Sequence, residues 1–428
     1  MENEKSYIAQ NGIRLYATKN ENIHSFFISL FLRSGSMYER DDECGLTHFL
    51  EHAVIRNVNS LMGGVLYSEL DSRGLEFNAS TYSEMVQFYT SGAEKNFRYA
   101  ADIISKVLDP IVLTPSEIKT ECERVKAEIR ESDDKTALST FANNIVHEGT
   151  TLSKSILGTA GGISRITRSR LAEYRKKNFT PDNIFLYVTG NFTDDDVEYL
   201  LAEIGKRELS SGEYHDNTAP VPKKFGKRER KVHIKNADFT MVRFNFDMDM
   251  SAIGIGEDDL LYDILLGGYN SRFFIEMSEE RGLFYDLTGS VEHYKNIGTF
   301  SFSFEVRAGT VYESIEMTLS ILSKLKRELL SEGECMKAAY VDNALMLADD
   351  AREMNFTFAY DSHIMGAGYK SLAERSSAYA AITPERIRAA AREIFRSENL
   401  TLTMKASKRK TDISRIEKIL DKFANNEL

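Results

Sequence analysis

The stretch that decides both the fold and the chemistry is His48-Phe49-Leu50-Glu51-His52. It predicts a helix in which His48 and His52, four residues apart, share one face and turn their rings toward one metal ion. Neutral imidazole nitrogens suit zinc, and a catalytic zinc site needs three protein ligands, which leaves a fourth position for water. Glu51 directly precedes the second histidine, so its carboxylate can take a proton from that water.

This H-x-x-E-H spacing is the reverse of the zinc signature H-E-x-x-H. A five-residue pattern with three fixed letters is weak on its own, and the alternative is two surface histidines on an amphipathic helix. The remaining histidines lack metal-ligand spacing to one another, so surface or core roles are expected for His24, His147, His215, His233, His293 and His363.

Composition narrows the class of protein. The chain has 428 residues, 42% of them hydrophobic and 28% charged, which predicts a soluble globular protein with two or more domains. The net charge of −11 argues against a nucleic-acid partner. No apolar stretch is long enough for a membrane span. Because the N-terminal residues are charged and the cysteines are few and far apart (Cys44, Cys122 and Cys335), we expect a cytoplasmic protein.

Polar and helix-breaking residues concentrate at 209–228, where Asn217, Pro220 and Pro222 mark an interdomain linker. We therefore predict one domain at 1–210, a linker at 211–228 and a second domain at 229–428. The basic run at 223–235 is interpreted as a solvated linker followed by a strand.

The two halves resemble each other. Arg73-Gly74-Leu75 and Arg281-Gly282-Leu283 each precede alternating segments, at 76–89 and 284–306, and then amphipathic helices at 97–107 and 311–325. This order predicts an ancient duplication. The expected fold is α+β, with two similar domains that each contain a mostly antiparallel sheet covered on one face by helices.

A second helix can supply the third metal ligand. Thr114-Pro115-Ser116-Glu117 combines an N-cap, a proline at the first helical position and a capping-box glutamate. Glu121 and Glu128 are seven residues apart and therefore share one face of this helix. Val125 and Ile129 provide its core contacts. The carboxylates available along it are Glu121, Glu123, Glu128 and Glu131.

The segment 45–52 resembles the zinc helix of the pitrilysin family, which includes insulin-degrading enzyme and the mitochondrial processing peptidase. The helix context Glu121-x-Glu123-Arg124-Val125-x-x-Glu128-Ile129 is also similar to that family. Further similar motifs lie at 74–81, 156–159, 179–183, 267–268, 271–273 and 281–285. The resemblance extends over roughly residues 10–405 and implies the short two-domain type, one half of a clamshell.

This resemblance assigns roles to the site residues. It implies one Zn²⁺ per chain, held by His48, His52 and Glu128, with Glu51 as the general base. Glu121 would orient a ligand histidine or the water network. The resemblance also places a peptide substrate on a sheet edge, where it adds as an extra strand to the backbone of Asn78, Ala79, Ser80 and Thr81.

The residues that grip the transition state depart from the family pattern. The family has an arginine and, seven residues later, a tyrosine that reach the substrate. Tyr285 occupies the tyrosine position, but Ser278 stands where the arginine would be, with Arg281 and Arg272 as possible substitutes. Members of this length pair as dimers and supply these groups in trans. We therefore favour a heterodimer with a related subunit over a homodimer.

The expected function is a zinc-dependent endopeptidase that cleaves peptides or unfolded protein segments, such as a leader or precursor peptide, inside a dimeric chamber. One alternative is a non-catalytic peptide-binding or assembly subunit, against which the intact Glu51 argues. Another is a metal-dependent hydrolase of a different bond, and the strand edge at 78–81 favours peptides over small substrates.

Overall fold

The computed structural model describes residues 3–132, 137–284 and 286–428, and its contacts form two compact units. Unit 1 consists of Met1–Ser132, Lys154–Asn217 and Asn343–Arg375, and unit 2 consists of Asp133–Ser153, Thr218–Asp342 and Ser376–Leu428. Each unit thus includes a segment from the other half of the sequence. The division into domains at 1–210 and 229–428, with a linker at 211–228, stays a prediction.

Unit 1 is built on a six-stranded sheet with the strand order β1-β2-β6-β3-β5-β4. The β2–β6 pair is parallel and the other neighbours are antiparallel. β4 therefore forms one edge of the sheet. The strands are β1 (Lys5–Ile8), β2 (Arg14–Lys19), β3 (Ser25–Leu32), β4 (Glu76–Thr81), β5 (Val86–Ala93) and β6 (Ile184–Gly190).

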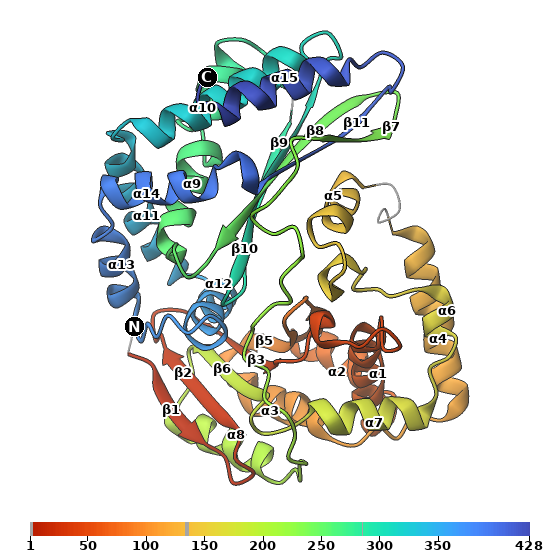
Figure 1. Cartoon of the computed structure of the whole chain (residues 1–428). Helices are drawn as coiled ribbons and strands as arrows, with labels where there is room; N and C mark the ends of the chain where they lie inside the picture. Colours follow the sequence, from red (N-terminus) through yellow and green to blue (C-terminus); the bar gives the residue numbers. More distant parts are fainter. Residues whose placement is uncertain (1–2, 133–136, 285) are drawn as a thin grey trace. The chain divides into compact units, whose positions relative to one another are not determined.

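Helices α1, α3 and α8 enclose the main core of unit 1, and α3 lies beside α8 along the sheet (Figure 1). The helices of this unit are α1 (Leu46–Leu61), α2 (Leu66–Arg73), α3 (Phe97–Ser105), α4 (Pro115–Glu131), α6 (Ala160–Ile163), α7 (Arg168–Asn178), α8 (Asp194–Gly205) and α12 (Ala351–Phe358). Shorter turns of helix are η1 (Ser36–Tyr38), η2 (Glu94–Asn96), η3 (Lys106–Leu108) and η7 (Ala359–Ile364).

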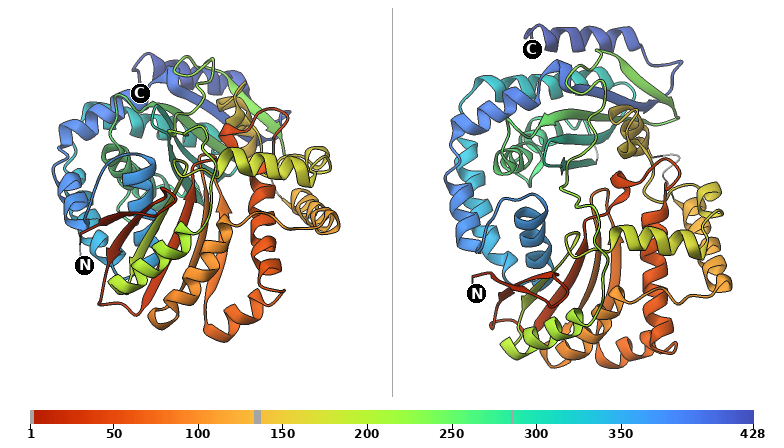
Figure 2. Two further views of the ribbon diagram at one scale, coloured as in Figure 1. Left: turned by 90° about the horizontal axis from the view of Figure 1, so that it is seen from below. Right: turned by 60° about the horizontal axis from the view of Figure 1, so that its bottom comes forward.

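The expectation that helices cover one face of each sheet is wrong for unit 1. A second core on the opposite face joins Phe31, Phe185 and Tyr187 to residues of α12 and η7. These two elements come from the C-terminal half of the sequence, and their blue ribbon can be followed in Figure 2. Asn355 on α12 anchors this cover, because its side-chain amide donates to the backbone carbonyls of Phe27 and Tyr187. β6 is buried along its whole length for this reason, as continuous apolar strands covered on both faces are.

Unit 2 repeats the strand arrangement of unit 1. Its order β7-β11-β8-β10-β9 corresponds to β2-β6-β3-β5-β4, and the one parallel pair, β7–β11, occupies the same place. The strands are β7 (Val232–Asn236), β8 (Thr240–Asp249), β9 (Leu287–His293), β10 (Ile297–Val306) and β11 (Leu400–Ala406). The predicted duplicated α+β fold with mostly antiparallel sheets is confirmed.

The helices of unit 2 pack over a core that includes Phe244, Phe302 and Phe395. They are α5 (Leu138–Val146), α9 (Ile255–Leu266), α10 (Val311–Arg327), α14 (Pro384–Ile394) and α15 (Ile413–Ala424), with the short η5 (Thr151–Ser153), η6 (Phe273–Glu279) and η8 (Ser397–Asn399). Helices α11 (Glu332–Leu347) and α13 (Leu372–Ala380) continue from one unit into the other. Among the described residues, no helix has the length and apolar character needed to cross a membrane.

Local signals in the sequence place the elements well. The capping box at Thr114 starts α4 as predicted, with its hydroxyl accepting from the backbone N–H of Glu117 and the Glu117 carboxylate accepting from Thr114. The predicted helices at 97–107 and 311–325 are α3 and α10. The alternating segment at 76–89 folds as two antiparallel strands, β4 and β5.

The basic run at 223–235 ends within a strand, β7, as predicted. The expectation that the part before the strand is solvated is wrong at Arg228. This side chain is buried and donates to both carboxylate oxygens of Asp247 on β8, at 2.7 and 2.8 Å. It also donates to the carbonyl of Val146 at the end of α5, at 2.7 Å. Arg228 thus joins α5 to the sheet of unit 2, and it satisfies a carbonyl that the helix end leaves without a partner.

Replacing Arg228 with alanine should lower the free energy of unfolding by about 3–5 kcal/mol, because the Asp247 carboxylate would stay buried without its partner. The measurement is the urea midpoint of the purified protein. Arg230→Ala is the matched control, since Arg230 pairs with Asp421 in an exposed position and should change stability by less than about 1 kcal/mol. Equal effects of the two variants would contradict this role of Arg228.

Candidate functional site

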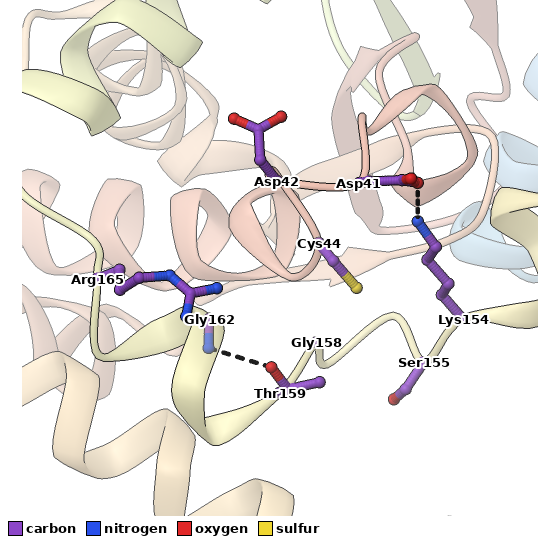
Figure 3. A pocket seen from close by; sticks show the side chains of 9 residues that line it. All are labelled: Asp41, Asp42, Cys44, Lys154, Ser155, Gly158, Thr159, Gly162 and Arg165. Carbon is purple, nitrogen blue, oxygen red and sulfur yellow. Dashed lines mark hydrogen bonds and ion pairs between the residues drawn. The ribbon is translucent and has the colours of Figure 1, made fainter.

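Helix α1 begins where two segments cross at a pair of glycines. Gly45 has a φ of 85° and Gly158 a φ of 73°, and a Cβ on Gly158 would lie 2.6 Å from the Cα of Gly45. The motif at 156–159 therefore abuts the first turn of α1. Figure 3 shows Gly158 and Thr159 below Cys44, with Thr159 accepting a hydrogen bond from the backbone N–H of Gly162 at 3.1 Å.

The N-terminus of α1 is capped from a distance. The buried carboxylate of Glu39 accepts from the backbone N–H groups of Gly45 and Thr47, at 2.9 and 2.7 Å. Burial raises the pKa of Glu39 to about 7, although these two hydrogen bonds act in the opposite direction. The sequence did not indicate this cap, because N-cap signatures concern the residue directly before the helix, whereas Glu39 lies six residues before Gly45.

The side chains of His48, His52 and Glu128 converge, with one ligand atom of each within 4.8 Å of the others. Nε2 of His48 lies 3.6 Å from Oε1 of Glu128, and Nε2 of His52 lies 3.5 Å from Oε2 of the same carboxylate. Ligand atoms around a tetrahedral zinc ion are about 3.4 Å apart for bonds near 2.1 Å. Two imidazole nitrogens and a carboxylate at these separations fit zinc in both geometry and chemistry.

The pKa values of the two histidines are shifted in opposite directions. Burial, together with the neighbouring His52, lowers the pKa of His48 to about 4, so His48 is neutral near pH 7. Burial also acts to lower the pKa of His52, but the hydrogen bond that its Nδ1 makes to the Glu121 carboxylate and the charges of Glu51, Glu121 and Glu128 outweigh it and raise that pKa. Metal binding therefore competes with a proton mainly at His52.

Glu121 holds His52 in position and does not join the ligand cluster. Its Oε1 lies 2.9 Å from Nδ1 of His52, and its Oε2 accepts from Nη1 of Arg56 at 3.1 Å. Burial alone would raise the pKa of Glu121, yet His52, Arg56 and Arg124 together lower it. A carboxylate that stays charged at this place fixes the imidazole so that Nε2 faces Glu128. Arg56, on the same helix as His52, was not found from the sequence.

Glu51 lies beside the ligand cluster and is almost fully buried. Burial raises its pKa, while a hydrogen bond from the hydroxyl of Thr81 to its Oε2, 2.5 Å long, acts to lower it. A buried carboxylate with a raised pKa is suited to take up and release a proton near neutral pH. The side-chain contact of Thr81 was not anticipated, because only its backbone was expected to serve the site.

The predicted substrate-binding residues, Asn78 to Thr81, lie on β4 at the sheet edge, next to α1. β4 pairs with β5 along one side, with Asn78 opposite Tyr89 and Thr81 opposite Val86. A cavity of about 530 Å³ opens between α1, β4 and α4, and Glu51 and His52 form part of its wall. Its other lining residues include Ile55, Tyr67, Phe77, Asn78 and Arg124.

Of the residues considered for contacts with the transition state, Ser278, Arg272 and Arg281 belong to unit 2. Tyr285 lies outside the described residues. Ser278 lies in η6, while Arg281 pairs with Glu313 on α10 at 3.4 Å and Arg272 approaches Glu328 at 3.8 Å.

Unit 2 also contains a cluster that the sequence did not indicate. Nε2 of His293 lies 2.5 Å from Oδ2 of the fully buried Asp258, and the neighbouring Asp259 accepts from the hydroxyl of Tyr379 at 2.5 Å. Since Asp258 and His293 are far apart in the sequence, no spacing pattern could reveal the cluster. These groups satisfy one another through hydrogen bonds, as buried polar groups generally do.

Both halves of the chain match models of known protein families. Residues 15–160 match the family described as insulinase (peptidase family M16), and residues 165–339 match the peptidase M16 inactive domain. The uncharacterized zinc protease YmxG of Bacillus subtilis is 22% identical over 408 residues, covering 91% of this chain and 95% of that protein.

Solved structures share the fold. A protease from Helicobacter pylori aligns with a TM-score of 0.82 at 17% identity and covers 94% of this chain and 99% of its own. The periplasmic protease PqqL from Escherichia coli aligns with a TM-score of 0.81 at 16% identity, covering 100% of this chain but 51% of that longer one.

The glycine crossing at the start of α1 can be tested with a matched pair of variants. Gly158→Ala should destabilise the protein by at least about 3 kcal/mol and reduce its bound zinc, because the new Cβ would displace the first turn of α1. Gly149→Ala has the same left-handed backbone, with a φ of 82°, but open space around the Cβ, so it should cost about 1 kcal/mol. Thermal unfolding and metal analysis measure both, and equal losses would contradict the crossing's role.

Proposed function

Because this chain belongs to the insulinase family of M16 peptidases, we propose that it is a zinc-dependent endopeptidase that cleaves peptides or unfolded protein segments. The observation that carries the proposal is the convergence of His48, His52 and Glu128, with Glu51 beside them and a strand edge within reach. A purely structural zinc site has no use for a buried carboxylate of this kind next to its ligands.

His48, His52 and Glu128 would hold one zinc ion per chain, and Glu121 would keep His52 turned toward it. When bound, zinc supplies Lewis acidity to the scissile carbonyl and lowers the pKa of a water. Glu51 takes the proton from the attacking water and then delivers it to the leaving amine. The raised pKa of Glu51 suits both steps, because the same group must act first as a base and then as an acid.

A peptide substrate would be held by β4. As the edge strand, β4 can accept an extended chain through main-chain hydrogen bonds, which are insensitive to sequence. The cavity beside Glu51 and His52 would receive one of the substrate's side chains. Ile55, Tyr67 and Phe77 line it together with charged groups such as Arg56 and Arg124, so it favours an amphipathic or polar side chain. This mode of binding suits unfolded segments, including a leader or precursor peptide. We also propose that the protein is located in the cytoplasm.

The proposal is tested by separating metal binding from catalysis. Glu51→Gln should retain zinc and thermal stability while losing peptide hydrolysis by at least about a hundredfold, because the base is removed and the ligands stay. His48→Ala should lose the metal itself. Metal analysis and cleavage of a quenched fluorescent peptide library measure both effects. Full activity of Glu51→Gln, or full zinc in His48→Ala, would overturn the assignment.

A non-catalytic, peptide-binding or assembly subunit is the second candidate. The match of residues 165–339 to a domain described as inactive is the observation that favours it. That segment lies outside the zinc-site residues, which fall within 48–128. Glu51→Gln distinguishes the two candidates. In a subunit that only binds peptides, this substitution should leave peptide binding unchanged, and there would be no hydrolysis for it to abolish.

We further propose that the chain works as a dimer, with a related subunit as the favoured partner. The fold of this chain corresponds to about half of PqqL, so a second chain would supply what PqqL carries in its other half. Ser278 at the expected arginine position supports a heterodimer, because two identical chains would both lack that arginine. Arg281 and Arg272 already approach carboxylates of their own unit.

The assembly proposal predicts that the zinc-loaded chain, purified alone, cleaves a mixed peptide library slowly. Adding a related subunit that carries the arginine should raise kcat by about a hundredfold or more, the usual contribution of a group that stabilises transition-state charge. Size-exclusion chromatography with light scattering should show one copy of each chain. Rapid cleavage by the lone chain would contradict the heterodimer.

A further inference from the structure

The carboxylate of Glu51 is held by a residue from a different element. Thr81, the last residue of β4, donates its hydroxyl to Oε2 of Glu51 at 2.5 Å. Among the residues that the structure describes, Thr81 is the side chain that hydrogen-bonds this carboxylate. Glu51 is 8% exposed, so the contact is largely shielded from water that would otherwise compete for it.

A general base must point its free oxygen at the water it activates. The α1 backbone sets the position of the Cα of Glu51 but leaves three side-chain torsions undetermined. The neighbouring His52 is fixed from α4, through Glu121 and Glu128. The hydrogen bond from Thr81 does the equivalent for Glu51, because it occupies Oε2 and leaves Oε1 to accept the proton.

The strand that carries Thr81 is itself held at both ends. At its start, the carboxylate of Glu76 accepts from Arg352 on α12 at 2.6 Å. At its end, Thr81 reaches Glu51, and between these points β4 pairs with β5 in regular register. The backbone that would receive a peptide therefore ends at the residue that orients the base.

We propose that Thr81 is a positioning residue whose hydroxyl fixes the carboxylate of Glu51 for catalysis, so that peptide binding on β4 and orientation of the base depend on one strand. This inference rests on the proposed peptidase function and adds a side-chain role to a residue expected to contribute backbone contacts. Thr81 keeps its own proton throughout. The proton from the attacking water moves to Oε1 of Glu51 and from there to the leaving amine.

Two substitutions separate the hydroxyl from the rest of the side chain. Thr81→Val keeps the branched shape and the strand preference but removes the donor, whereas Thr81→Ser keeps the donor. With the zinc-loaded protein and its partner subunit where one is needed, Thr81→Val should lower kcat about 10- to 100-fold and change KM less than about twofold. Thr81→Ser should keep kcat within about threefold of the wild type, and both should retain zinc.

A second measurement needs no activity. In the metal-free protein, Thr81→Val should lower Tm by about 2–4 °C, because the buried carboxylate loses its donor. The same substitution in a Glu51→Ala background should change Tm by less than about 1 °C, since the carboxylate is already gone. A residue that contributes only packing or strand structure would shift Tm equally in both backgrounds.

The outcomes are distinguishable. Unchanged kcat in Thr81→Val, equal losses in the Val and Ser variants, or an effect confined to KM would each overturn the positioning role while leaving the peptidase function standing. Equal Tm shifts in the two backgrounds would overturn it as well. Absence of cleavage by the zinc-loaded wild-type protein, with and without a partner, would overturn the proposed function and the role of Thr81 together.

Discussion

The hydrogen bond between His52 and Glu121 is the interaction on which the site depends. It joins α1 to α4 through a carboxylate that is 1% exposed and that also accepts from Arg56. A zinc site requires ligand atoms placed within about 0.2 Å of their ideal positions. Two helices separated by the 53 residues 62–114 have no local reason to meet that accurately. A buried, charged carboxylate bonded to one ligand imidazole supplies that accuracy.

The sheet edge is the second constraint. α1 lies beside β4, so the metal ligands and the strand that would receive a peptide are neighbours in one unit. An exposed edge strand is usually a liability, because its unpaired backbone groups invite other chains to pair with it. In the proposed binding mode, the same property would let β4 pair with a peptide substrate. The contact between Thr81 and Glu51 ties the edge to the proposed general base, which distinguishes β4 from an edge strand that is merely uncovered.

The two units share a duplicated fold but not the cluster of metal-ligating side chains. Their strands have the same order and the same single parallel pair, yet the ligand cluster sits in unit 1 while the corresponding edge strand of unit 2 ends at His293 and its hydrogen bond to Asp258. Each unit is completed by a segment from the other half of the sequence: α12 covers the sheet of unit 1, and α5 is joined to unit 2 by Arg228. These exchanged segments explain why central strands such as β6 are buried on both faces.

The sequence by itself determined the features that depend on local spacing. The pattern His48-x-x-Glu51-His52, the capping box at Thr114 and the repeated order of strands and helices were sufficient to predict the duplicated α+β fold and the histidine pair. Glu128 followed from family resemblance, because four glutamates on α4 were equivalent by composition. Only the tertiary structure decided which groups meet across the chain: Glu39 capping α1, Arg228 inside unit 2 and Thr81 on Glu51. The physical reason is that helix and strand periodicity is set by neighbouring residues, whereas these contacts arise from packing between elements far apart in the sequence.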